Sequence, residues 1–262
     1  MSPNFKAILI LIIQVTNAKT IIELTETFQN AYDNFFVENP MTDLVRVISQ
    51  TDMDQINNYG CYCYFEENHG KGKGVAQDSI DRICKTLHDG YECIMMDQAE
   101  LGNSCTPWTV QYNSTNGAGF SPSLQSVIDS CESQNDINDL CAIESCKVEA
   151  YFISNLVNYF VSGGLIDDSL KHENGFDVDS QCRTRGSRNN GNNNNNNNGQ
   201  SNGSNGSSGA VVAVGERKCC GDYPTRFVYH DLDGERGCCA GRTYNTISLQ
   251  CCNDGTTAVT CN

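Results

Sequence analysis

Sixteen cysteines in a chain of 262 residues constrain its folding more than any other feature. Such a density indicates a disulfide framework and therefore an oxidising compartment. Eight cysteines lie from Cys61 to Cys146, and eight lie from Cys182 onward. Because each set is even, each part of the chain can pair internally, and we expect Cys182 to pair within the C-terminal set. A zinc site is the alternative use of clustered cysteines, and secretion disfavours it.

The N-terminus is typical of a secreted protein. Lys6 precedes an apolar run at residues 7–15, and small residues at 16–18 offer a cleavage point. The run is too short to span a bilayer comfortably. We therefore expect residues 1–18 to be a signal peptide and the mature, extracellular protein to begin at Lys19. An uncleaved signal would instead act as an anchor.

Apolar residues recur at helical spacing in several segments of residues 19–181. These segments are residues 20–36, a stretch from Met41, and residues 79–96, 123–139 and 142–161. Gly163 and Gly164 end the last one. The pattern predicts a mainly α-helical, disulfide-rich domain over residues 19–181. Cysteines in its two long helices could cross-link them side by side.

Residues 183–209 consist mostly of Asn, Gly and Ser, with seven consecutive asparagines at 192–198. This composition predicts a flexible linker without core-forming residues. Asn202 and Asn205 begin glycosylation sequons here, and Asn113 begins another one in the preceding domain. We expect Asn113 at the surface.

Residues 210–262 contain three Cys-Cys pairs and few apolar residues, so disulfides must hold this module together. The sequence predicts short strands at segments 226–232 and 243–250. It predicts turns at Asp233-Gly234 and Asp254-Gly255. The resulting prediction is a small, β-rich module. Its carboxylates at Asp231, Asp233 and Glu235 could chelate calcium, but the pattern lacks a Glu at EF-hand spacing, which favours turn stabilisation.

The formal net charge of −15 restricts the class of partner. It disfavours nucleic acid, because phosphate binding requires clustered Lys and Arg, and it disfavours tight adsorption to anionic membranes. Calcium ions or calcium mineral are compatible with it. Solubility alone is the favoured explanation of the acidity.

His88 and Asp89 are the residues best suited to chemistry. A histidine near its usual pKa can activate water, and a carboxylate together with backbone carbonyls can hold Ca²⁺ beside a developing oxyanion. Adjacent residues on a helix point about 100° apart, so one can hold water while the other faces a metal. A loop with glycines at 70, 72 and 74 offers bare backbone for such carbonyls. His69 in this loop reads as a solvated residue rather than a ligand.

The order of motifs from residue 57 onward is specific. The segment NNYGCYC (57–63) is followed by G-x-G, then by D-x-x-D-R-x-C, then by His-Asp. This succession resembles the secreted phospholipase A2 family over about residues 43–161. The resemblance implies two long antiparallel helices stapled by disulfides, with a calcium loop at one end. It also implies calcium-dependent hydrolysis of the sn-2 ester of glycerophospholipids at a membrane surface that is contacted transiently.

The family's roles transfer to individual positions here. The resemblance makes His88 the general base and Asp89 the bidentate calcium ligand. The carbonyls of Tyr62, Gly70 and Gly72 complete the calcium shell. The calcium loop is longer than usual in the family.

The chain departs from the family pattern near the catalytic pair. Ile83 replaces one cysteine of the usual pair, and no aspartate follows Cys146 to orient His88. Glu149 is the candidate replacement, with Glu144 as the alternative, and one of them should lie within hydrogen-bond reach of the His88 ring.

A lost orienting carboxylate could also mean lost activity. The alternative function is therefore a non-catalytic, calcium- or lipid-binding extracellular matrix protein on the same scaffold. Its matrix contact would be the C-terminal module, which weakly resembles the di-cysteine repeats of galaxin-like matrix proteins.

Overall fold

The computed structural model describes residues 55–65, 69–113, 124–182 and 215–261, with the backbone but not the side chain of Val161. The expected signal peptide, the helices expected over residues 20–36 and from Met41, the linker, and the sequons at Asn202 and Asn205 lie outside these residues. Asn113 is described, and it is exposed, as its sequon predicted.

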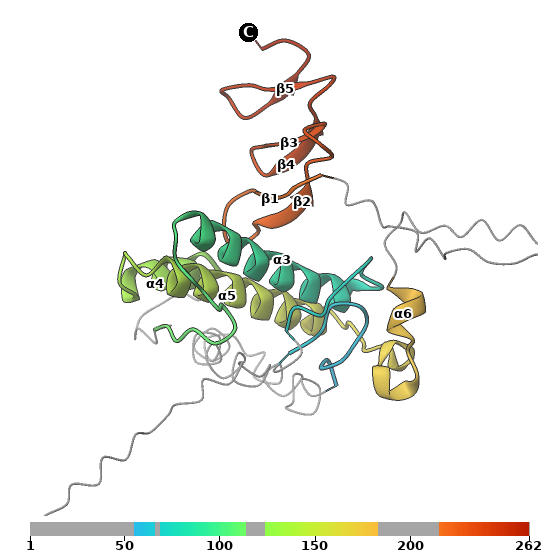
Figure 1. The fold of residues 1–262 in the computed structure, drawn as a ribbon. Helices are drawn as coiled ribbons and strands as arrows, with labels where there is room; N and C mark the ends of the chain where they lie inside the picture. Colours follow the sequence, from blue (N-terminus) through green and yellow to red (C-terminus); the bar gives the residue numbers. More distant parts are fainter. Residues whose placement is uncertain (1–54, 66–68, 114–123, 183–214, 262) are drawn as a thin grey trace, which may run out of the picture.

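Two long helices form the body of the protein (Figure 1). α3 (Ser79–Glu100) and α5 (Leu140–Val161) lie side by side and run antiparallel, and α4 (Leu124–Gln134) packs along α5. The three helices predicted for this part of the chain are thus confirmed, with α3 longer and α4 shorter than expected. Within the described residues, no helix is both long and apolar enough to cross a membrane.

Local sequence explains where the two long helices begin. Asp78 caps α3 by accepting the N–H of Asp81 at 2.8 Å, and Asp139 caps α5 by accepting the N–H of Ala142 at 3.0 Å. Past the end of α5, Gly163 adopts a left-handed conformation with φ 83°, which favours glycine. One face of α3 is buried in the core through Ile80, Cys84, Leu87, Tyr91 and Ile94.

α3 and α5 approach each other closely at Gly90. A Cβ atom added to Gly90 would lie 2.7 Å from Cγ1 and 2.9 Å from Cγ2 of Val148. Next to this contact, the Tyr91 hydroxyl donates to Glu149 on α5 at 2.7 Å. The glycine between Asp89 and Tyr91 therefore sets how near the second helix lies to the predicted site.

Short elements return the chain from α5 toward the start of α3. They are two 3₁₀ turns, η2 (Asp168–Leu170) and η3 (His172–Asn174), and the short helix α6 (Val178–Gln181). They bring Cys182 to its disulfide with Cys61.

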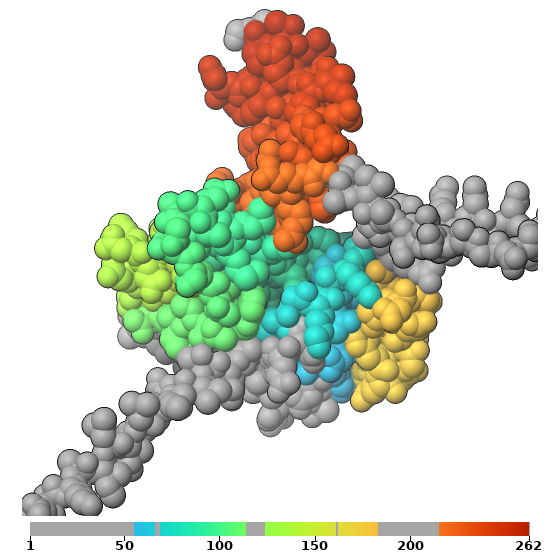
Figure 2. Space-filling view, in the orientation of Figure 1, coloured from blue at the N-terminus to red at the C-terminus, as the bar shows by residue number. Residues whose placement is uncertain are grey.

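The C-terminal module consists of three two-stranded antiparallel hairpins. β1 (Arg217–Cys220) pairs with β2 (Phe227–His230), β3 (Arg236–Cys239) with β4 (Arg242–Asn245), and β5 (Gln250–Cys251) with β6 (Thr257–Ala258). The predicted segment 226–232 contains β2, and segment 243–250 overlaps β4 and reaches the first residue of β5, while β1, β3 and β6 were not predicted. Asp254-Gly255 forms the turn of the third hairpin, and Asp233-Gly234 forms a turn between the first two hairpins. The module stands on the α3 side of the body and projects away from it (Figure 2).

All sixteen cysteines form disulfides, which leaves no thiolate for zinc. The expectation of two internally paired sets is wrong, because Cys61 bonds to Cys182 and Cys93 bonds to Cys219. These two disulfides take two cysteines from each set and leave an even number in both. Counting cysteines therefore could not reveal them. The expected cross-link between the long helices is also absent. The cysteines of α3 pair with Cys63 and Cys219, and those of α5 pair with segments that precede it.

The disulfides of the module follow one rule. In each Cys-Cys pair the first cysteine bonds toward the N-terminus and the second bonds to the next hairpin or loop. The bonds are Cys93–Cys219, Cys220–Cys238, Cys239–Cys251 and Cys252–Cys261. The three hairpins therefore form a covalently linked ladder that starts on α3.

Candidate functional site

The predicted site lies where α3 meets the glycine loop, by which we mean residues 61–77, of which 66–68 are outside the described residues. Asp81 anchors this loop. Its carboxylate is fully buried and accepts three backbone N–H groups, from Cys61 at 2.9 Å, Tyr62 at 2.7 Å and Gln77 at 2.8 Å. A Cβ on Gly60 would lie 2.5 Å from the Asp81 carboxyl carbon, so glycine is required there.

Sequence reasoning assigned no role to Asp81. Burial raises the pKa of its carboxyl, and the three N–H groups act in the opposite direction. Its position three residues after the capping Asp78 was the only signal in the sequence. The chain thus holds both ends of the glycine loop on one buried side chain at the start of α3.

Tyr62 and Gly72, two of the predicted calcium ligands, contact each other. A Cβ on Gly72 would lie 2.4 Å from the Tyr62 ring, and the Tyr62 hydroxyl donates to the Gly74 carbonyl at 2.8 Å. The Tyr62 carbonyl accepts the N–H of Tyr64 at 2.8 Å, and the Tyr62 backbone also hydrogen-bonds with the His88 ring. Gly70 has φ 82°, which favours glycine, and open space around it.

Asp89 already holds a cation. The Lys85 ammonium, one helical turn earlier, donates to its carboxylate and lies 5.3 Å from the centre of the Tyr62 ring. Burial raises the pKa of Asp89, while Lys85 acts to lower it and Glu92 adds to the rise. Lys85 therefore sits between the predicted metal ligand and the glycine loop.

His88 presents a shielded ring nitrogen. Its Nε2 is buried and has no hydrogen-bond partner among the described residues. Burial lowers the pKa of His88 to about 4; hydrogen bonding with the backbone of Tyr62 opposes this shift, and the charge of Lys85 adds to it. The imidazole is consequently neutral at physiological pH, which is the form that can accept a proton.

Glu149, the candidate orienting carboxylate, has other partners in the structure. It is fully buried and accepts hydrogen bonds from the hydroxyls of Tyr91, at 2.7 Å, and Tyr112. The pKa of both tyrosines is raised well above the usual value. Burial is the largest cause, and the charge of Glu149 and its hydrogen bonds add to it. No hydrogen bond joins Glu149 to His88 within the described residues, so Tyr91 and Tyr112 are the groups that this carboxylate positions.

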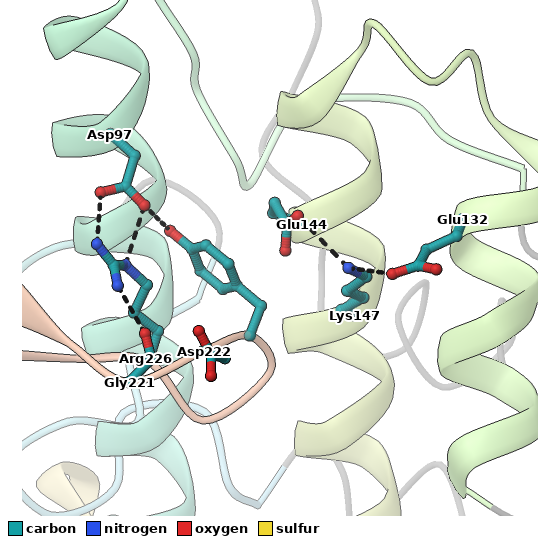
Figure 3. Close-up of a pocket in the computed structure, with 8 residues that line it drawn as sticks. Asp97, Glu132, Glu144, Lys147, Gly221, Asp222 and Arg226 are labelled. Atoms are coloured by element: carbon teal, nitrogen blue, oxygen red, sulfur yellow. Dashed lines mark hydrogen bonds and ion pairs between the residues drawn. The ribbon is translucent and has the colours of Figure 1, made fainter. Parts of the chain in front are cut away.

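Glu144, the other candidate, points to a different region. It forms an ion pair with Lys147 at 3.4 Å and lines a pocket of about 470 Å³ at the junction of α3, α4, α5 and the first hairpin (Figure 3). On the opposite wall of this pocket, Asp97 accepts the Tyr223 hydroxyl at 2.9 Å and the Arg226 guanidinium at 3.0 Å. The bonds of Tyr223 and Arg226 to Asp97 thus fasten the module to the body. The pocket they line is separate from His88.

His69 is not the solvated loop residue that we expected. Its ring stacks on Trp108, with 5.6 Å between ring centroids and 15° between planes, and it lies 5.7 Å from Tyr91. The His69 and His88 ring centroids are 6.3 Å apart. The long glycine loop therefore folds its histidine into an aromatic cluster beside His88, which no local sequence signal indicated.

The donor set chosen from the sequence suits calcium chemically, because it consists only of oxygens. It holds one carboxylate, on Asp89, and backbone carbonyls. The described residues contain no group of three or more His, Cys, Asp or Glu side chains that could hold a metal. In the module, Asp231 accepts the N–H groups of Glu216 at 2.8 Å and Asp233 at 3.1 Å, and it pairs with Lys218, so it stabilises its turn as predicted.

Comparison with known proteins provides no family. No protein-family model matches the chain, and no curated protein is significantly similar to it. The geometry around His88 and Asp89 is therefore the basis for a functional assignment.

Proposed function

We propose that the chain is a secreted, calcium-dependent, phospholipase A2-like hydrolase. It would cleave the sn-2 ester of glycerophospholipids to a fatty acid and a lysophospholipid. The observation that carries the proposal is the meeting of three parts at one place on α3: an imidazole with a buried nitrogen, a carboxylate that already holds a cation, and the glycine loop. Eight disulfides support an oxidising, extracellular setting.

In the proposed reaction, His88 takes a proton from the water whose oxygen attacks the ester carbonyl carbon. His88 then returns that proton to the lysophospholipid oxygen as the ester C–O bond breaks. Asp89 and the carbonyls of Tyr62, Gly70 and Gly72 would hold Ca²⁺, which supplies positive charge for the oxyanion. Glu149 supports the site indirectly, through its hydrogen bonds with Tyr91 and Tyr112.

The second candidate function is a non-catalytic extracellular matrix protein that binds calcium or lipid. Two observations favour it. Glu149 contacts tyrosines rather than His88, and a disulfide-linked module projects from the body. In that case the module would bind the matrix partner.

Release of fatty acid from phosphatidylcholine vesicles, measured with calcium and with a chelator, tests the proposal. We expect release only with calcium, and a loss of 10²-fold or more in His88→Gln, as is typical when a general base is removed. His230→Gln is a matched control, because His230 is exposed on β2 of the module. No release by the parent protein, or equal release by the His88→Gln variant, would refute the enzyme. Calcium-dependent vesicle binding without release would support the second candidate.

A further inference from the structure

Lys85 is paired with the carboxylate on which the proposed calcium site depends. Its ammonium contacts the Asp89 carboxylate on one side and lies over the Tyr62 ring at 5.3 Å on the other. The Tyr62 ring in turn packs on Gly72, and its hydroxyl is bonded to the Gly74 carbonyl. A positive charge from the chain itself is thus placed at the junction of the one carboxylate and the glycine loop.

We propose that Lys85 is a built-in competitor for calcium, so that the ion binds Asp89 only by displacing the Lys85 ammonium. This inference rests on the proposed calcium site and adds its regulation. Lys85 is attached one turn from Asp89, so its ammonium is always available at a high local concentration. Calcium must therefore reach a higher concentration to occupy the carboxylate than it would need without Lys85.

The partial burial of the pair gives the competition its strength. The side chain of Asp89 is 17 % exposed and that of Lys85 is 33 % exposed, so the pair is screened less than an exposed ion pair. Displacement does not leave Lys85 buried and unpaired, because a flexible four-carbon stem at a third exposure can turn the ammonium into water. The exchange is therefore reversible.

The next charges on the same side of α3 extend the pattern. Glu92 follows Asp89 by three residues and adds negative charge near it, and Arg217 on β1 of the module pairs with Glu92. Each carboxylate on this part of α3 thus has its own cation, Lys85 for Asp89 and Arg217 for Glu92. Arg217 pairs with Glu92 and not with Asp89. Removing its charge should therefore change the calcium affinity less than removing that of Lys85.

Calcium titration calorimetry on the intact protein and on Lys85→Gln tests the proposal. A neighbouring opposite charge weakens the hold of a carboxylate on another cation by about tenfold or more, so Lys85→Gln should bind calcium at least about tenfold more tightly. Lys218→Gln removes the same charge from an ion pair in the module and should leave the affinity unchanged. Arg217→Gln should produce a smaller gain than Lys85→Gln.

Amine labelling of the unmutated protein provides a second measurement that does not depend on a variant folding. Calcium should increase the acylation of Lys85, read by mass spectrometry, and leave that of Lys218 constant. Unchanged labelling of Lys85, or equal calcium affinities with and without its charge, would overturn the competition.

Asp89→Asn separates this inference from the proposed function. If Asp89→Asn abolishes calcium binding while Lys85→Gln leaves the affinity unchanged, the calcium site stands and the competitor is refuted. If Asp89→Asn has no effect on calcium binding, the proposed site itself is wrong, and the competitor fails with it.

Discussion

Replacing Gly90 by alanine tests the contact that places α5 against the site. In an isolated helix this change should stabilise α3 by about 1 kcal/mol, because glycine is a poor helix former. Here the new methyl would lie 2.7 Å and 2.9 Å from the two γ-carbons of Val148. Val148 is β-branched and is held in one rotamer on a helix, so it cannot turn away, and overpacking of this kind costs about 1–3 kcal/mol. We therefore expect Gly90→Ala to lower the free energy of unfolding by about 1 kcal/mol.

Guanidinium unfolding of the oxidised protein, followed by circular dichroism, measures this change. Val148→Ala provides the matched partner, because it removes the two methyl groups that the new Cβ would meet. The double variant should be more stable than the sum of the two single changes predicts, by about 1–2 kcal/mol. A Gly90→Ala protein that is about 1 kcal/mol more stable than the parent, with no coupling to Val148→Ala, would show that the helices are not in contact at Gly90.

Three further predictions concern the site and its attachment. In the metal-free protein, the free energy of unfolding should fall by up to about 3 kcal/mol as pH drops from about 6.5 to about 4. In this range His88 binds a proton in the unfolded chain but not in the folded protein, where its pKa is lowered. Denaturation at several pH values should show a shallower fall in His88→Gln; identical curves would contradict the shift. Asp81→Ala should cost about 3 kcal/mol or more, since three buried N–H groups lose their acceptor, and a melting temperature within a degree of the parent's would exclude this role. Arg226→Ala should cost about 1 kcal/mol overall, yet speed hydrogen exchange in β2, because its contacts with Asp97 and with the Gly221 carbonyl are lost; unchanged exchange would argue against a fastening role.

Features that depend on neighbouring residues were predictable from the sequence, and features that depend on distant ones were not. The helical periodicity and the Asp254-Gly255 turn arise from local interactions, and both appear in the structure. The pairing of Lys85 with Asp89 could have been read from their spacing of four. By contrast, the partners of Glu149 come from α3 and from a loop that meets α5 only in the folded chain.

The two disulfides that join the halves of the chain show the same limit. Cys61–Cys182 and Cys93–Cys219 close loops of more than a hundred residues, with sequence separations of 121 and 126. Counting cysteines gives the same parity with or without such a pair of bonds. The approach of the module to α3 selects the Cys93–Cys219 bond, and the return of α6 toward the glycine loop selects the Cys61–Cys182 bond.

The alternating disulfides of the module also define how it would respond to a pulling force. A continuous covalent path runs from Cys93 through each Cys-Cys peptide bond to Cys261, and it bypasses the loops of all three hairpins. Tension applied at the C-terminal end would therefore travel along this path without unravelling the hairpins, and a cut in any one hairpin loop would not release the rest of the module. The load would arrive on α3 at Cys93, little more than one helical turn from His88.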